Sequence, residues 1–109
     1  MQYVKVAQIH DVKDGEKKRI SFNERTVLLA NVGGTYYAID DRCPHMGASL
    51  SEGTLSGFGI ACPRHGTTFD IRNGKVIQNG KLAFLNLHVK DAQAYAVKVE
   101  GDDVFIGLE

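Results

Sequence analysis

Short segments of alternating apolar and polar residues, separated by glycine-containing turns, constrain the fold of this chain more than any other feature. Alternation at period two places the apolar side chains on one face of a strand. A Gly-Gly or Asn-Gly pair between two such segments favours a tight hairpin, because these residues tolerate the positive φ angles of the turn. Gly33-Gly34 and Asn73-Gly74 fit this pattern, and Gly101 begins a third turn. We therefore predict antiparallel hairpins at these three places.

The predicted strands account for most of the chain, and no segment carries an apolar stripe of useful length at helical spacing. Residues 9–15 are polar and predict a turn or a single helical turn. The expected fold is all-β: an antiparallel sandwich or partly open barrel of about eight to ten short strands, in one domain over residues 1–109. The predicted strands are residues 3–7, 19–22, 26–32, 35–39, 69–71, 75–77, 85–90, 95–100 and 104–108.

Charge and hydropathy argue against two classes of partner. The chain carries 13 basic and 13 acidic residues, so no net positive field favours a nucleic acid. Its longest apolar runs are four residues, whereas a bilayer-spanning helix needs about 20. The N-terminal residues lack the basic and apolar regions of a secretory signal. We therefore expect a cytoplasmic protein that binds neither nucleic acid nor membrane.

Residues 41–69 interrupt the alternating pattern. This stretch holds five glycines and both prolines and both cysteines of the chain. A connection of this length is uncommon in a compact domain, and long loops that a domain retains are usually functional. We predict a small sub-lobe inserted into the sheet and built on two loops, at about residues 41–50 and 60–69.

Two short groups of potential metal ligands lie within this stretch, Cys43-Pro44-His45 and Cys62-Pro63-Arg64-His65, with sixteen residues between them. Two Cys and two His on separate loops can hold a metal centre from both sides. The proline after each cysteine restricts the neighbouring backbone, and Gly47 and Gly66 allow the chain to pass close to the centre. A structural zinc site and a Cys43–Cys62 disulfide are the alternatives to an iron–sulfur centre.

The pattern resembles the Rieske family of iron–sulfur proteins, in the motif segments 43–47, 50–53 and 65–70. The β pattern on both sides of these segments also fits, so the resemblance covers nearly the whole chain. It implies a Rieske-like fold with one [2Fe–2S] cluster, held by two thiolates on one iron and two histidine ring nitrogens on the other. On this chain the implied ligands are Cys43, Cys62, His45 and His65. Neutral imidazoles leave the cluster less negative than four thiolates would, which makes its reduction easier.

The resemblance also places the chain in the low-potential part of the family. High-potential members carry an extra cysteine in each loop, whereas this chain has only two cysteines. Those members also have a serine and a tyrosine that donate hydrogen bonds to cluster sulfur, and the matching residues here are Thr67 and Phe69. Phe69 cannot donate, so the reduced and more negative cluster is stabilised less. We therefore expect a low, ferredoxin-like potential.

The chain resembles the free-standing Rieske ferredoxins that carry one electron from a flavoprotein reductase to a terminal oxygenase. The resemblance implies a monomeric electron carrier with no catalytic residues of its own. We expect docking where His45 and His65 reach the surface, beside an apolar rim of Met46, Pro63 and Leu50. Two other functions stay open: the small subunit of an assimilatory nitrite reductase, which would bind a large subunit, and a redox sensor.

Overall fold

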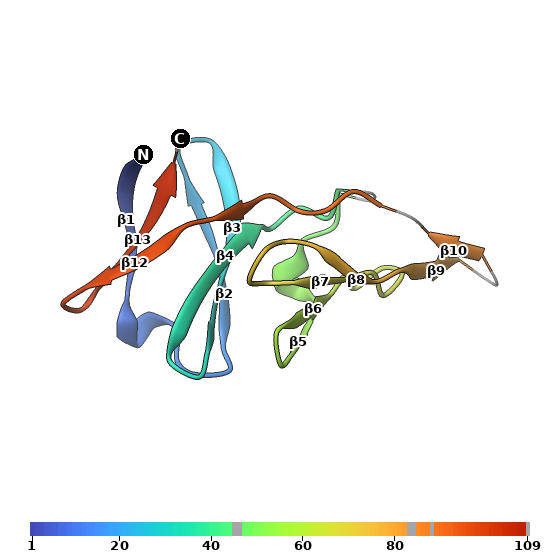
Figure 1. The fold of residues 1–109 in the computed structure, drawn as a ribbon, viewed down its shortest axis with the longest axis horizontal. Coiled ribbons are helices and arrows are strands. Elements are labelled where there is room, and N and C mark those ends of the chain that lie inside the picture. The colour runs from blue at the N-terminus through green and yellow to red at the C-terminus, as the bar shows by residue number, and fades with distance from the viewer. Residues whose placement is uncertain (45–46, 83–84, 88, 109) are drawn as a thin grey trace.

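The structure is a computed structural model that describes residues 1–44, 47–82, 85–87 and 89–108 (Figure 1). Strands make up nearly all of the regular secondary structure in the described residues, and the two 3-10 turns make up the rest, which confirms the expected all-β class. No helix within these ranges is long and apolar enough to cross a membrane. The elements are β1 (Gln2–Gln8), η1 (Ile9–Asp11), β2 (Lys17–Phe22), β3 (Arg25–Val32), β4 (Thr35–Asp40), η2 (Leu50–Glu52), β5 (Thr54–Ser56), β6 (Gly59–Ala61), β7 (Thr68–Asp70), β8 (Val76–Gln78), β9 (Gly80–Leu82), β10 (Leu85–Leu87), β11 (Ala94–Tyr95), β12 (Val97–Glu100) and β13 (Asp103–Leu108), where η marks a single turn of 3-10 helix.

Two antiparallel sheets pack together and form what we call the base. One sheet has the strand order β1-β13-β12 and the other has the order β11-β4-β3-β2. Their shared core consists of the buried residues Ala7, Val12, Ile20, Val27, Leu29, Ala38, Val104 and Ile106. The sheets do not close into a barrel, so the base is a sandwich, the first of the two forms that the sequence predicts.

A second unit, which we call the lobe, consists of the antiparallel sheet β5-β6-β7-β8 and the β9–β10 hairpin. Figure 1 shows the lobe beside the base, with the hairpin at the end of the molecule away from the two termini. Both cysteines belong to the lobe core, which consists of Leu28, Ala30, Ile39, Cys43, Leu50, Ile60, Cys62, Phe69, Ile71 and Ala92. The sub-lobe predicted for residues 41–69 is therefore confirmed, and it continues to β10.

Strand β3 connects the two cores because it is buried on both faces. Val27 and Leu29 belong to the base core, whereas Leu28 and Ala30 belong to the lobe core, and all four are fully buried. A strand covered on both sides is a continuous apolar run rather than an alternating one. This burial explains the four-residue apolar run at residues 27–30 and fixes the lobe relative to the base.

The predicted hairpin turns are confirmed, with one difference in width. Gly33 and Gly34 connect β3 to β4 with φ angles of 65° and 90°, and Gly101 lies between β12 and β13 with φ 60°. Gly74 also has a positive φ, of 79°, but the turn from β7 to β8 is longer than two residues. Asp70 closes this wider turn, because its carbonyl oxygen accepts the N–H of Gly74 at 2.7 Å.

Some strands differ from the predictions in ways that short-range patterns explain. Strands β5, β6 and β9 have three residues each, too few for alternation to be visible in the sequence. Tyr95 pairs with Ala38 of β4, so it is not part of the strand β12 that pairs with β13. Of the strand expected at residues 85–90, the structure shows β10 over three residues, and residue 88 lies outside the described part of the chain.

Candidate metal centre

The first cysteine loop, residues 43–48, follows β4 and is closed by two backbone hydrogen bonds. The N–H of Cys43 donates to the carbonyl of Ala48 at 2.8 Å, and the N–H of Gly47 donates to the carbonyl of Cys43 at 2.9 Å. Gly47 has a φ of 69°, a left-handed conformation that glycine adopts without strain. The Cys43 side chain is buried. His45 and Met46 lie outside the described residues, so the histidine predicted for this loop is not placed.

A buried carboxylate holds the first loop in the lobe. Asp41 is 2% exposed, and its Oδ1 accepts the N–H of Ser51 at 2.8 Å while its Oδ2 accepts the hydroxyl of Ser49. The N–H of Leu50 donates to the Asp41 carbonyl at 2.6 Å. Arg19 Nε lies 3.5 Å from Oδ2 and offsets the buried negative charge. This anchor was not predicted from the sequence, although a carboxylate just before Cys-Pro, with two serines beyond the loop, was a usable signal.

The second cysteine loop, residues 62–67, repeats this geometry. The N–H of Cys62 donates to the carbonyl of Thr67 at 2.8 Å, and the N–H of Gly66 donates to the carbonyl of Cys62 at 3.2 Å. Gly66 has a φ of 80°. The backbone N–H groups of Arg64 and His65 in addition donate hydrogen bonds to the Cys62 sulfur. This loop therefore presents backbone donors to its cysteine.

The two thiols meet inside the lobe core. They are free rather than joined in a disulfide, and their side chains lie close enough to influence each other's ionisation. Burial is the main cause that raises the pKa of the Cys62 thiol; Cys43 raises it further, and the N–H groups of Arg64 and His65 oppose the rise. Buried thiols become stable as thiolates when a cation binds to them. The two free, buried thiols are therefore suited to act as metal ligands. Their free state contradicts the alternative of a Cys43–Cys62 disulfide.

The His65 ring carries a buried nitrogen that lacks a hydrogen bond. Its Nδ1 is inaccessible to solvent and has no partner within the described residues, although the side chain as a whole is partly exposed. A buried polar atom without a partner is rare in proteins because it costs about 1–3 kcal/mol. Coordination of a metal through Nδ1 satisfies this atom. Within the described ranges, no three His, Cys, Asp or Glu side chains are grouped closely enough to hold a single ion.

The other predicted neighbours of the site are of two kinds. Pro44, Pro63 and Gly66 are exposed. Phe69 is fully buried in the lobe core, where it packs and offers no polar hydrogen. Thr67 is 3% exposed, and its Oγ1 accepts the N–H of Gly80 at 3.1 Å. The Thr67 hydroxyl therefore retains its own hydrogen for donation.

The prediction of Leu50 as part of an exposed apolar rim is wrong. Leu50 begins η2 and is fully buried in the lobe core together with both cysteines. The single helical turn directs this side chain inward, and a turn this short shows no apolar period in the sequence. Of the other two rim residues, Pro63 is exposed and Met46 lies outside the described part of the chain.

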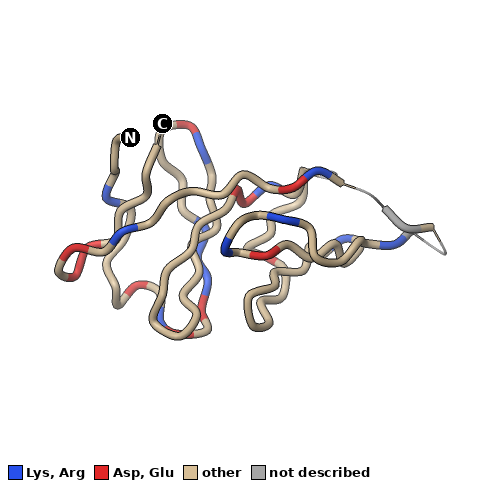
Figure 2. The backbone as a smooth tube through the Cα atoms, viewed as in Figure 1, with Lys and Arg blue, Asp and Glu red and all other residues tan. Residues whose placement is uncertain are grey.

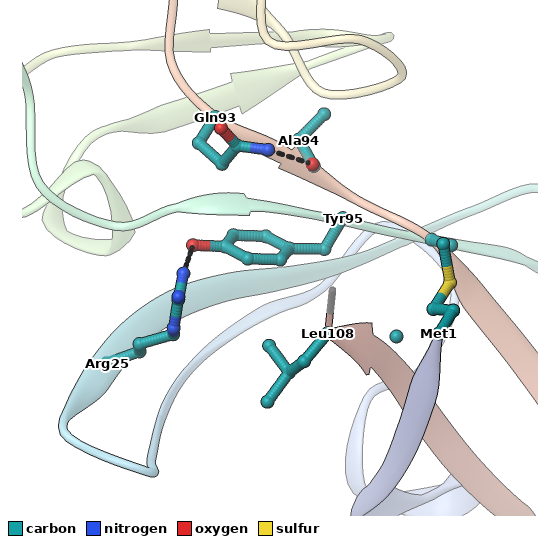
Figure 3. A pocket seen from close by; sticks show the side chains of 8 residues that line it. Met1, Arg25, Gln93, Ala94, Tyr95 and Leu108 are labelled. Atoms are coloured by element: carbon teal, nitrogen blue, oxygen red, sulfur yellow. Dashed lines mark hydrogen bonds between the residues drawn. The ribbon is translucent and has the colours of Figure 1, made fainter.

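A separate pocket of 240 Å³ lies in the base, and Figure 3 shows it. In it Arg25 donates from Nη1 to the Tyr95 hydroxyl oxygen at 3.2 Å, and the Tyr95 hydroxyl donates to Asp40 Oδ1. Burial is the main cause that raises the pKa of Tyr95, and Asp40 adds to it. These polar groups satisfy one another, so the pocket offers no free ligand set and we assign it no role.

Comparison with known proteins gives a consistent result. The model of the Rieske [2Fe-2S] domain family matches residues 2–88. The 3-phenylpropionate/cinnamic acid dioxygenase ferredoxin subunit of Escherichia coli (strain K12) is 39% identical over 110 residues, which cover 99% of this chain and 95% of that protein.

Two solved structures share the fold. The ferredoxin of carbazole 1,9a-dioxygenase from Nocardioides aromaticivorans IC177 matches with a TM-score of 0.85 and 27% identity, over 100% of both chains. The terminal oxygenase of carbazole 1,9a-dioxygenase from Novosphingobium sp. KA1 matches with a TM-score of 0.82 and 29% identity, over 96% of this chain but 29% of that one. The family match, the curated relative and the fold agree with the two cysteine loops, and this chain belongs to the Rieske [2Fe-2S] domain family.

Proposed function

We propose that this protein is the ferredoxin of a dioxygenase system and carries one electron at a time to a terminal oxygenase. The observation that carries this proposal is the end-to-end match to a dioxygenase ferredoxin subunit, over 99% of this chain and 95% of that protein. The fold alone does not separate a carrier from an oxygenase, because the chain also matches 29% of a terminal oxygenase. Because the match spans both chains almost completely, it favours an electron carrier over an oxygenase. It also favours an electron carrier over a nitrite reductase subunit or a redox sensor.

The proposed cofactor is one [2Fe–2S] cluster, with Cys43 and Cys62 on one iron and His45 and His65 on the other. The buried thiol pair and the unpaired Nδ1 of His65 support three of these ligands, and His45 is assigned from the sequence motif. When bound, such a cluster accepts and releases one electron reversibly. The protein keeps the thiolates away from water, donates hydrogen bonds to the Cys62 sulfur, and leaves the imidazole of His65 partly exposed.

This division of ligands suggests how an electron enters and leaves. The cysteines are buried in the lobe core, whereas the partly exposed His65 and the exposed Pro63 and Gly66 lie at the surface of the second loop. A partner that docks over this loop approaches the histidine-bound iron most closely. We propose a flavoprotein reductase as the electron donor and the terminal oxygenase as the acceptor. We further propose a monomer in the cytoplasm, where cysteines remain reduced and available for a cluster.

Charge at the lobe favours acidic partners. Residues 43–81 carry four basic and two acidic residues, whereas residues 82–109 carry two basic and five acidic ones (Figure 2). Asp70 and Arg72 pair with each other at 2.9 Å, which leaves three basic residues and one acidic residue in residues 43–81. Arg64 and Lys81 are exposed. Electrostatic attraction of this kind acts mainly on the association rate and is screened by salt.

The test is reconstitution. Purified protein that contains the cluster should allow substrate hydroxylation by a Rieske oxygenase and its flavoprotein reductase, and omission of the protein should abolish it. Arg64→Gln or Lys81→Gln should slow electron transfer at low salt about twofold to fivefold, whereas the control Lys98→Gln in β12 should leave the rate unchanged. Hydroxylation at the same rate without the protein would refute the proposed function.

A further inference from the structure

A third segment, outside both cysteine loops, contacts the second loop directly. The N–H of Gly80, at the start of β9, donates to Thr67 Oγ1 at 3.1 Å. The next N–H, that of Lys81, donates to the carbonyl oxygen of His65 at 2.9 Å. Two consecutive backbone donors therefore bind two residues of the loop that carries Cys62 and His65.

Glycine at position 80 is required by space. A Cβ atom there would lie 2.5 Å from Thr67 Oγ1, 2.7 Å from the His65 carbonyl oxygen and 2.9 Å from the Thr67 nitrogen. Two of these three atoms are backbone atoms, which cannot rotate away. The φ angle of Gly80 lies outside the left-handed region, so the need for glycine comes from the close approach of the two chains and not from the backbone dihedral.

The contacts of this segment extend to both proposed ligands of the second loop. The Lys81 bond fixes the backbone of His65 itself. The Gly80 bond fixes Thr67, whose carbonyl oxygen in turn accepts the N–H of Cys62 at 2.8 Å. A displacement of β9 should therefore move the His65 imidazole. It should at the same time change the hydrogen bond from Cys62 to Thr67 that closes the loop.

We propose that Gly80 and Lys81 are positioning residues of the cluster site, whose two backbone N–H groups hold the second loop and so set the potential and the retention of the cluster. This proposal rests on the ligand set of the proposed function. The orientation of histidine ligands and the hydrogen bonds around a cluster are the features by which a protein tunes such a centre. Loss of either backbone contact should change both properties while the base stays folded.

Two pairs of variants separate this role from a general effect on stability. Gly80→Ala fills the close contact, and its control is Gly107→Ala in β13, where the nearest atoms to a Cβ belong to the flexible side-chain end of Met1 and the ring of Tyr3 and none of them is a backbone atom. Lys81→Pro removes the N–H that bonds to His65, and its control Lys81→Arg keeps both that N–H and the positive charge of the exposed side chain. Each variant is compared with the wild-type protein loaded with its cluster.

We expect Gly80→Ala and Lys81→Pro to shift the midpoint potential, to change the EPR g-values of the dithionite-reduced protein, and to speed bleaching by a chelator about tenfold, which corresponds to about 1.4 kcal/mol. The two controls should match the wild type in all three readouts. Unchanged potential, g-values and bleaching rate in both variants would overturn the proposal.

One measurement on the unaltered protein guards against variants that fail to fold. The amides of Gly80 and Lys81 should exchange with deuterium as slowly as those of the base strands, because both are hydrogen-bonded. Exchange as fast as in an exposed turn would overturn the proposal even if no variant could be purified. A wild-type protein that binds no cluster would instead refute the proposed function, so the two failures are distinguishable.

Discussion

The two cysteine loops share one internal geometry and differ in what holds them. In each loop the cysteine N–H donates five residues onward, and the N–H of a left-handed glycine donates back to the cysteine carbonyl. The first loop is anchored by a side chain, the buried carboxylate of Asp41. The second loop is anchored by a neighbouring backbone, at Gly80 and Lys81. The backbone geometry within each loop is therefore repeated, whereas the contact that anchors each loop depends on the elements that pack around it.

The largest expected effect tests whether the two loops are equal partners. Cys43→Ser and Cys62→Ser each remove one of the two buried thiols that share the lobe core. We expect either variant to lose the cluster, because each thiolate would supply one of the two protein ligands to one iron. The measurements are iron and sulfide content and the visible absorption of the purified protein.

The exposed His10 provides the control, since it lies on η1 in the base. His10→Ala should retain full iron content and the wild-type spectrum. A Cys43→Ser protein that kept its spectrum while Cys62→Ser lost it would show that the loops are unequal and that the proposed ligand set is wrong.

The anchor of the first loop gives the next largest effect. Asp41→Ala leaves the N–H of Ser51 and the hydroxyl of Ser49 without their acceptor, at a cost of about 2–3 kcal/mol in the free energy of unfolding. Asp41→Asn keeps an acceptor oxygen and should cost about 1 kcal/mol. Urea unfolding measures both, and equal losses for the two variants would argue that the hydrogen bonds are not what holds this loop.

The loops themselves could be predicted from sequence because their information is local. The Cys-Pro pairs, the nearby histidines and the left-handed glycines all lie within a few residues of one another. The anchors could not be predicted in this way. Gly80 contacts Thr67 across 13 residues, and its need for glycine arises only from the approach of another backbone.

Burial of single residues was the other limit. Leu50 lies in a polar stretch between Ser49 and Ser51 and gives no periodic signal, yet η2 places it in the lobe core. Strand β3 was predicted correctly, but its burial on both faces became clear only once the lobe was seen to pack against the base. In both cases the missing information is the identity of the neighbouring element.

The left-handed glycine of each cysteine loop allows a further comparison of the two loops, with a smaller expected effect on stability. Gly47→Ala and Gly66→Ala each place a Cβ in a conformation that costs about 1–2 kcal/mol. At Gly47 the new atom also meets the Arg42 side chain at 3.2 Å, whereas at Gly66 nothing lies within 4 Å. We expect Gly47→Ala to lower the urea midpoint more than Gly66→Ala. Asparagine at either position should cost less than alanine, since it tolerates this conformation better.

The smallest effect concerns a charge pair at the far end of the strand that follows the second loop. Asp70 ends β7 and accepts two hydrogen bonds from the Arg72 guanidinium, at 3.0 and 2.9 Å, which holds the pKa of this carboxyl below its ordinary value of 3.8. A carboxyl whose pKa is lower in the folded state adds stability above its unfolded pKa and loses it as the pH falls through the folded value. Arg72 is half exposed, so the contribution should be below about 1 kcal/mol.

Asp70→Asn removes this charge but keeps an acceptor for the N–H of Arg72, which closes the turn after β7. The difference in urea midpoint between wild type and Asp70→Asn should therefore be constant from pH 7 to about pH 5 and shrink as the pH falls below 4. Exposed Asp102, in the turn between β12 and β13, supplies the control, and Asp102→Asn should show no such pH dependence. A difference that grew in acid would mean that the pair opposes folding.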